Sequence, residues 1–124
     1  DVGALVTGTV AGCDPAWGLC RLSLPGGELW VANTGESEGT PLRVRILARD
    51  VSITLERAQH TSIQNHLPCV VSQIAPPVGH QVLVRLDASG THVLARLTAR
   101  AADQLQLRVG MHVWAQIKAV SLVR

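Results

Sequence analysis

The 124-residue sequence contains no phenylalanine and no tyrosine, and its three tryptophans are far apart in the chain. Proteins that bind single-stranded nucleic acid usually stack bases on aromatic side chains within a basic groove. With so few aromatic residues and a formal net charge of only +2, the sequence argues against nucleic acid as a partner. Its apolar residues are mainly valine, leucine, alanine and isoleucine, and the β-branched members favour strands.

The usual sequence signatures of catalysis and membrane insertion are also missing. No G-x-x-x-x-G-K-[ST] loop is present, so the chain lacks the common phosphate-binding loop of ATPases. No serine lies in a nucleophile elbow, and no cysteine and histidine have a spacing that supports covalent catalysis. No apolar run approaches the ~20 residues that cross a bilayer. We therefore expect a binding domain that is not an enzyme.

Cysteine and histidine show no spacing typical of a metal site. The cysteines Cys13, Cys20 and Cys69 are odd in number. We interpret them as reduced, half-buried thiols of a cytoplasmic protein, and the alternative is one disulfide between Cys13 and Cys20 across a turn. The five histidines are dispersed, and we expect them at the surface or at strand edges. No metal ion is predicted as a bound cation.

The pattern of apolar residues and turns is typical of a mainly β protein. Strands are predicted over residues 4–12, 19–24, 28–32, 42–48, 51–55, 68–74, 81–86, 91–97 and 113–122. Pro68 places its strand at a sheet edge, because proline has no backbone donor. Thr98 is a good N-cap for one short helix over residues 99–104. We expect an all-β fold of two small OB-like barrel repeats packed together.

The last predicted strand has a counterpart earlier in the chain. Val120-Ser121-Leu122 resembles Val51-Ser52-Ile53 at an offset of 69 residues, and this offset aligns Arg49 with Lys118. The chain therefore divides into two sub-repeats, which are residues 1–56 and residues 57–124. Lys118 is expected to lie within the last strand as a buried cation, and a buried ammonium group needs a partner.

Three segments offer hydrogen-bond donors and no carboxylate. They contain Ser62 and Gln64 before a strand, Thr98 at the helix start, and Lys118 with the backbone amides of Ala119 and Val120. A deprotonated tetrahedral oxyanion such as molybdate, tungstate or sulfate only accepts hydrogen bonds, so its site must consist of donors. Each residue also has an ordinary explanation, as a turn residue, a helix cap or a lysine at a barrel rim. From these residues alone, both interpretations stay open.

Three motifs taken together are similar to those of a known family. Thr61-Ser62-Ile63-Gln64-Asn65-His66-Leu67, Leu97-Thr98 with its short helix, and Gly110 through Ile117-Lys118-Ala119 resemble the molybdate-binding MOP or TOBE repeat. The stretch from Leu42 to Ser52 looks like the version at the C-terminus of the molybdate ABC transporter's ATP-binding subunit. The resemblance covers nearly the whole chain and extends to the molbindins.

The resemblance implies a ligand and the residues that hold it. Molybdate or tungstate would lie at the subunit interface of a homodimer formed through the β-barrels. The implied contacts are Ser62, Gln64, Thr98, Lys118, Ala119 and Val120. Gln64 stands where the family has arginine, and Ala101 stands where it often has a hydroxyl, so two donors differ. No equivalent site is expected in the first repeat.

The resemblance also implies a setting for the chain. It suggests a cytoplasmic regulatory domain, peripheral to the inner membrane, in an importer ATPase subunit that contacts ABC permease subunits. The nucleotide-binding domain of such a subunit would lie outside this chain. Two alternatives stay open, a free-standing molbindin-like molybdate buffer and a dimerisation scaffold whose anion site has decayed.

Overall fold

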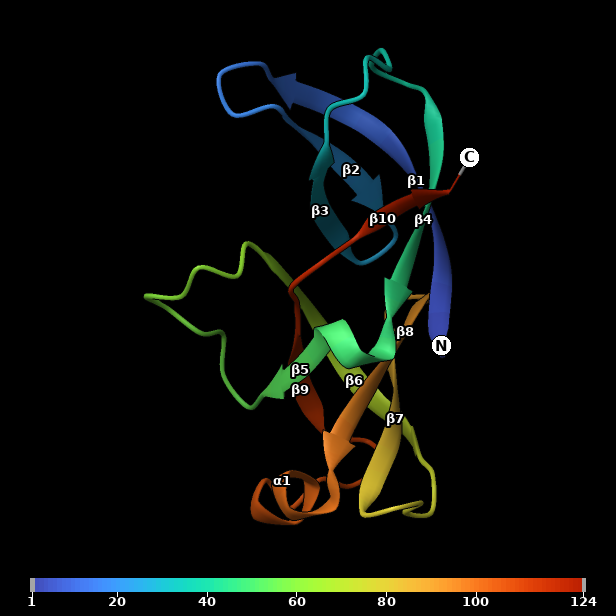
Figure 1. Ribbon diagram of the computed structural model, residues 1–124, viewed down its shortest axis with the longest axis vertical. Coiled ribbons are helices and arrows are strands. Elements are labelled where there is room, and N and C mark those ends of the chain that lie inside the picture. The colour runs from blue at the N-terminus through green and yellow to red at the C-terminus, as the bar shows by residue number, and fades with distance from the viewer. Residues whose placement is uncertain (1, 124) are drawn as a thin grey trace.

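The computed structural model describes residues 2–123 and shows a mainly β chain with one short α-helix (Figure 1). In chain order the elements are β1 (Gly3–Asp14), β2 (Leu19–Leu24), β3 (Gly27–Ala32), β4 (Pro41–Leu47), the 3-10 turn η1 (Ala48–Asp50), β5 (Val51–Thr54), β6 (Asn65–Ile74), β7 (Gln81–Ala88), β8 (Thr91–Thr98), α1 (Ala99–Gln104), β9 (His112–Ile117) and β10 (Ser121–Val123). No helix in this range is long and apolar enough to span a membrane. The expected all-β class with one short helix is confirmed.

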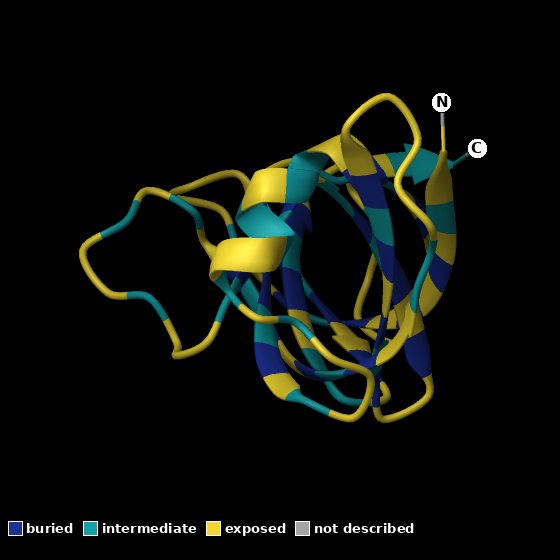
Figure 2. Ribbon diagram, turned by 90° about the horizontal axis from the view of Figure 1, so that it is seen from below, coloured by how far each residue is buried: buried dark blue, intermediate teal, exposed yellow. Residues whose placement is uncertain are grey.

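The strands form two five-stranded antiparallel sheets. One has the order β10-β4-β1-β2-β3, and the other has the order β5-β9-β6-β7-β8. Each sheet curls strongly, and the two lie one above the other along the long axis of the molecule (Figure 1). Figure 2 shows buried positions alternating with exposed ones along the strands. This arrangement confirms two OB-like β units packed together.

The alternation of apolar residues places one face of each strand in the core. In β7, Val82, Val84 and Leu86 are buried, and the residues between them are more exposed. Successive side chains of a strand point to opposite faces, which explains this period of two. The buried residues of both sheets form one continuous hydrophobic cluster. Burying one valine or leucine contributes roughly 1.5–3 kcal/mol, so the shared cluster holds the two sheets together.

Each sheet contains one strand from the other half of the chain. β5 follows the first sheet's β4 in sequence but pairs with β9 of the second sheet. β10 follows β9 but pairs with β4 of the first sheet. Figure 1 shows this exchange as the red β10 lying in the upper barrel and the green β5 in the lower one. The sub-repeats 1–56 and 57–124 stay a prediction about sequence, because the sheets combine strands from both.

The predicted single strand over residues 113–122 is wrong. β9 ends at Ile117 and β10 begins at Ser121, so the three residues between them carry the chain from one sheet to the other. Lys118 begins this connection and is exposed. The prediction of a buried ammonium group is therefore also wrong. The segment is apolar enough to be one strand, but it must leave one barrel to reach the next.

The internal repeat is present, with a shift that the sequence comparison missed. The facing pairs in the two exchanged ladders are Ser52 with Gln116 and Ser121 with Arg45. β5 and β10 thus correspond at 69 residues, whereas their partner strands correspond at 71, from position 45 to position 116. Lys118 matches Leu47, so its alignment with Arg49 is wrong. The first repeat has two more residues here, and η1 accommodates them.

The strand that contains Pro68 is longer and more central than predicted. β6 begins at Asn65 and lies between β9 and β7. Its ladder with β9 spans Asn65 to Val70, but its pairing with β7 starts only at Val70. At Pro68 the strand therefore has a partner on one side only. The missing proline donor explains this local edge inside a central strand.

The hairpin turn between β2 and β3 packs against the second barrel. The Thr91 hydroxyl donates a hydrogen bond to the carbonyl oxygen of Pro25 over 2.7 Å. Gly26 has a positive φ of 93°, and a Cβ at this position would lie 2.0 Å from the Ala88 carbonyl oxygen. Only glycine allows this close approach together with this backbone conformation. The Pro-Gly-Gly turn thus joins the two barrels.

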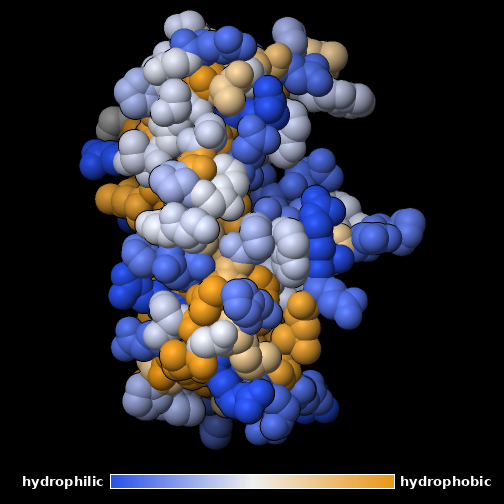
Figure 3. Space-filling view, turned by 180° about the vertical axis from the view of Figure 1, so that it is seen from behind, coloured by the Kyte–Doolittle hydropathy of each residue, from blue (hydrophilic) through white to orange (hydrophobic). Residues whose placement is uncertain are grey.

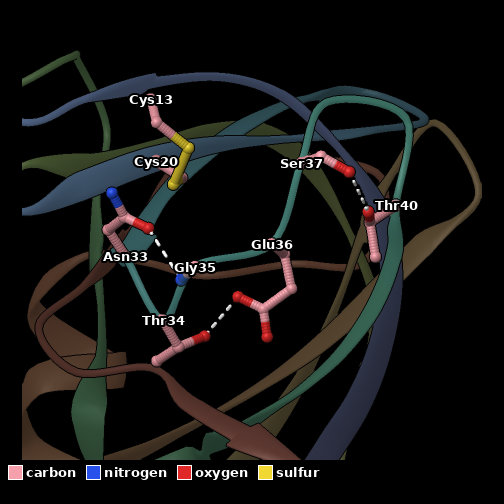
Figure 4. Close-up of a disulfide and its surroundings, with 8 residues drawn as sticks. All are labelled: Cys13, Cys20, Asn33, Thr34, Gly35, Glu36, Ser37 and Thr40. Atoms are coloured by element: carbon pink, nitrogen blue, oxygen red, sulfur yellow. Dashed lines mark hydrogen bonds between the residues drawn. A yellow bond between two sulfur atoms is a disulfide. The ribbon is translucent and has the colours of Figure 1, made fainter.

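Two of the three cysteines form a disulfide. Cys13 and Cys20 face each other across β1 and β2 and are bonded (Figure 4). The interpretation of all three as reduced thiols is therefore wrong, and the disulfide alternative holds. The two bonded cysteines occupy adjacent strands on either side of a tight turn, which brings their Cβ atoms together. Cys69 is free and buried, and burial raises the pKa of its thiol to about 11.

Candidate functional site

The end of the β6–β9 ladder brings two of the predicted site residues together. Asn65 and Ile117 are the last facing pair of this antiparallel ladder. Gln64 comes immediately before Asn65, and Lys118 comes immediately after Ile117, so both lie at the same end of the sheet. Ser62 precedes Gln64 by two residues on the same segment. The local geometry therefore gathers a hydroxyl, an amide and an ammonium group.

The side chains at this end of the sheet are open to solvent. Ser62, Gln64 and Lys118 are exposed. Lys118 is the only lysine of the chain, and it forms no ion pair with any residue from 2 to 123. An unpaired ammonium group keeps its donors available for an anion. The charge at this end of the sheet is therefore not neutralised within one chain.

The backbone of the connection after β9 offers further donors. The Lys118 N–H donates to the carbonyl oxygen of Asp50 over 2.8 Å and is therefore occupied. Ala119 and Val120 lie outside the strands, and within residues 2–123 their N–H groups have no backbone acceptor. Ala119 is exposed and Val120 is half-buried. These two amides are the backbone donors that stay free next to the ammonium group.

Thr98 lies at the opposite end of the same sheet. It faces Gln81 at one end of the β7–β8 ladder, which runs to Ala88 and Thr91 at the other. The β6–β7 ladder runs from Val70 with Asp87 to Ile74 with Val84, so position 81 lies beyond the far end of β6 from Asn65. Figure 1 shows α1, which Thr98 precedes, at the bottom of the lower barrel, away from the β9–β10 connection. One chain does not bring Thr98 and Lys118 together.

Thr98 has the local role that the sequence predicted. Its hydroxyl oxygen accepts a hydrogen bond from the Ala101 N–H over 3.0 Å, so it caps α1. Such a cap stabilises a helix by roughly 1 kcal/mol. Thr98 itself is exposed, and its hydroxyl hydrogen is free to donate outward.

Asn65 has a structural role that the sequence analysis missed. Its side-chain oxygen accepts from the Trp30 N–H over 2.7 Å, and its side-chain nitrogen donates to the Trp30 carbonyl oxygen over 3.1 Å. Asn65 is buried, so it closes the edge of β3 in the way a neighbouring strand would. Asn65, Leu67 and Cys69 are all buried, and this phase within the strand was the available signal for a buried asparagine.

Gln64 also borders a pocket between the two barrels. This pocket has a volume of about 530 Å³, and its lining residues are Asp14, Trp17, Leu19, Trp30 and Gln64. The loop over residues 55–64, which leads to Gln64, projects from the body (Figure 1), and its surface is hydrophilic (Figure 3). Within residues 2–123, no group of three or more histidine, cysteine, aspartate or glutamate side chains could hold a metal ion.

Known proteins share this fold and sequence. The TOBE domain family matches residues 61–123. The chain is 45% identical over 125 residues to "Molybdenum import ATP-binding protein ModC 1" of Azotobacter vinelandii, covering 99% of this chain and 34% of that protein. The ModC protein of Thiobacillus denitrificans is 47% identical with the same two coverages. The chain thus spans about a third of the length of these relatives.

A solved structure supports the fold independently. The cytoplasmic molybdate-binding protein ModG, in a molybdate-bound form, matches with a TM-score of 0.80, 21% sequence identity, and coverage of 97% of this chain and 93% of that chain. This likeness extends over both barrels and the exchanged strands, since almost the whole chain is covered. The resemblance to the TOBE repeat is confirmed by the match over residues 61–123, and this chain belongs to the TOBE domain family.

Proposed function

We propose that this chain is a molybdate-binding regulatory domain of a molybdate importer's ATP-binding subunit. Its support is the 45% and 47% identity to ModC proteins over 99% of the chain, together with the fold of molybdate-bound ModG. ATP hydrolysis would belong to sequence outside the matched third of those relatives, and this chain would bind without catalysing. The subunit would work in the cytoplasm, at the inner membrane, against ABC permease subunits.

The observation that carries the proposal is the position of Lys118. The only ammonium group of the chain is exposed and unpaired beside Gln64 and the free amides of Ala119 and Val120. Molybdate and tungstate are both tetrahedral dianions that accept hydrogen bonds only, so this set of donors suits either. Gln64 in place of arginine removes one cation, and we expect weaker binding for that reason.

We propose that two copies of the chain complete the site. Thr98 lies at the other end of the sheet from Lys118, so its hydroxyl would reach the anion only from a second copy. An anion held between two copies stabilises the arrangement in which both contact it, by its differential affinity for that arrangement. The homodimer through the β-barrels is therefore the form in which molybdate would regulate transport. A dimerisation scaffold without anion binding is the alternative that the experiment addresses.

The test is thermal unfolding with molybdate, tungstate or sulfate at equal ionic strength. A ligand that binds only the folded state, at about 100 times its Kd, adds roughly 2.7 kcal/mol of stability, which is a shift of several degrees for a domain of this size. Lys118→Ala should remove most of this shift. Arg43→Ala, which removes an exposed cation from β4, should keep it and serves as the matched control.

Two results of this experiment would contradict the proposal. If no anion raises the melting temperature of the unaltered chain, the oxyanion site does not exist in this protein. If Lys118→Ala and Arg43→Ala reduce the shift equally, the anion acts by general charge screening rather than at the β6–β9 end. Sedimentation of the same samples should show that molybdate increases the dimer fraction, and Thr98→Ala should reduce this increase more than Thr98→Ser.

A further inference from the structure

The pocket beside Gln64 has a composition unlike that of the oxyanion site. Two of the three tryptophans of the chain, Trp17 and Trp30, line it together with Leu19. Asp14 is the only charged residue in the lining. Asp14 forms no ion pair with any residue from 2 to 123. A carboxylate at this position would repel molybdate, so the pocket needs a different ligand.

The hairpin that carries Trp17 is ordered, although its tip lies in solvent. Trp17 has an exposed fraction of 78%. Its N–H donates to the Asp14 carbonyl oxygen over 3.2 Å, and the Asp14 carboxylate accepts from the Ala16 N–H over 3.1 Å. The Asn33 N–H holds the Gly18 carbonyl oxygen over 2.9 Å. Since the turn is already fixed, little conformational entropy is lost when a ligand contacts Trp17.

The other side of the pocket is fixed equally well. The Trp30 backbone is held on both its N–H and its carbonyl oxygen by Asn65. The nearby Arg21 guanidinium does not occupy the pocket, because it pairs with Glu28 over 3.1 Å. The result is a preformed cavity of about 530 Å³, which is within the usual range for a small-ligand site.

We propose that this pocket binds an organic cation, with a quaternary ammonium or guanidinium group as the recognised chemistry. Tryptophan is the best partner for a cation placed over an aromatic face, and a carboxylate adds direct attraction. The chain already contains one such contact, because the Arg57 guanidinium lies 5.9 Å from the centre of the Trp114 ring. The cation comes either from a free small molecule or from an arginine side chain of a partner. The site does not depend on the proposed oxyanion function.

The experiment is a tryptophan fluorescence titration of the intact chain with two cationic probes. Choline represents a free quaternary ammonium ligand, and N-acetyl-arginine amide represents a protein side chain. The neutral isostere of choline, 3,3-dimethyl-1-butanol, and sodium chloride at equal ionic strength are the controls. We expect a saturable change with at least one cation at millimolar concentration and none with either control. The tighter of the two cations identifies the source.

Three variants test the location of the site. Asp14→Asn should weaken cation binding at least five-fold, and Trp17→Ala should remove it, while circular dichroism shows that the fold is retained. Trp114→Phe removes the tryptophan on the other barrel and should leave the affinity unchanged. The proposal fails if neither cation gives a saturable change, if the neutral isostere binds as well as choline, or if Asp14→Asn has no effect.

Discussion

Among single residues, Asn65 connects the two barrels most directly. It is buried and satisfies both backbone groups of Trp30, and it is the neighbour in sequence of Gln64. A buried side chain that completes a strand edge in this way leaves two polar groups unpaired when it is removed. The residue next to the proposed anion contact is therefore also the residue that fixes the junction of the barrels.

Replacing Asn65 by alanine should lower the free energy of unfolding by about 2–4 kcal/mol, because unpaired polar groups of Trp30 would remain partly buried. Asn65→Asp keeps an acceptor for the Trp30 N–H but loses the donor for its carbonyl oxygen, so we expect an intermediate loss. Urea unfolding followed by circular dichroism measures both. Gln64→Ala, at an exposed neighbour, should change stability by less than about 0.5 kcal/mol. Equal losses for Asn65→Ala and Gln64→Ala would contradict this role.

Cys69 gives the protein a pH dependence on the alkaline side. Its pKa in the folded state is about 11, raised by burial from 9.0. A group whose folded pKa is raised contributes stability that is fully present below the unfolded pKa, here about 9, and is lost as the pH rises through 11. We expect the free energy of unfolding to fall by about 2–3 kcal/mol over this window. Unfolding curves of Cys69→Ala should lack this fall, although its stability at pH 7 is lower.

Single residues also show how far local sequence information reaches. Thr98 as the cap of the helix over residues 99–104 could be predicted, because a cap is decided by neighbours in sequence. The exposure of Lys118 could not be predicted, because it depends on a strand leaving its sheet to pair with β4. The proximity of Gln64 to Lys118 follows from the register of β6 and β9, which no local pattern contains.

At the level of elements, the hairpin of β1 and β2 is closed by the Cys13–Cys20 disulfide. Closing a loop of this length stabilises a fold by about 2 kcal/mol in the chain-entropy model. A reducing cytoplasm would keep these thiols open, so we expect two stability levels for the same chain. The buried Cys69 does not take part.

Dithiothreitol should therefore lower the melting temperature by several degrees at pH 7. Cys13→Ser should melt at this lower temperature with or without the reductant, because its disulfide is already absent. Differential scanning fluorimetry measures both. A chain that melts at the same temperature in its oxidised and reduced forms, as checked by thiol counting, would show that the bond adds nothing to stability.

Most elements could be predicted from the sequence because their patterns are local. β2 and α1 have the predicted bounds, and the Pro-Gly-Gly turn lies where it was expected. The breaks were harder. The last strand reads as one apolar run, yet it divides at residues 118–120 because β10 has a partner in the other sheet. Long-range pairing, rather than composition, decided where that strand ends.

At the level of the whole molecule, the two halves depend on each other. β5 completes the second sheet and β10 completes the first, and all buried side chains belong to one cluster. We expect residues 1–56 and residues 57–124, produced separately, to remain largely unfolded. Mixed together, they should associate and regain the strand signal in far-ultraviolet circular dichroism. Independent folding of either half would contradict this interdependence.

The exchange of β5 and β10 also has a consequence for synthesis on the ribosome. Translation delivers β1 to β4 early, but the strand that covers the outer edge of β4 comes from the last residues of this sequence. Until those residues leave the exit tunnel, β4 presents an unpaired edge that another nascent chain is able to join. A slow codon or a stall before Ser121 would prolong that exposure. Premature termination there would thus affect the first barrel, although the missing residues belong to the end of the chain.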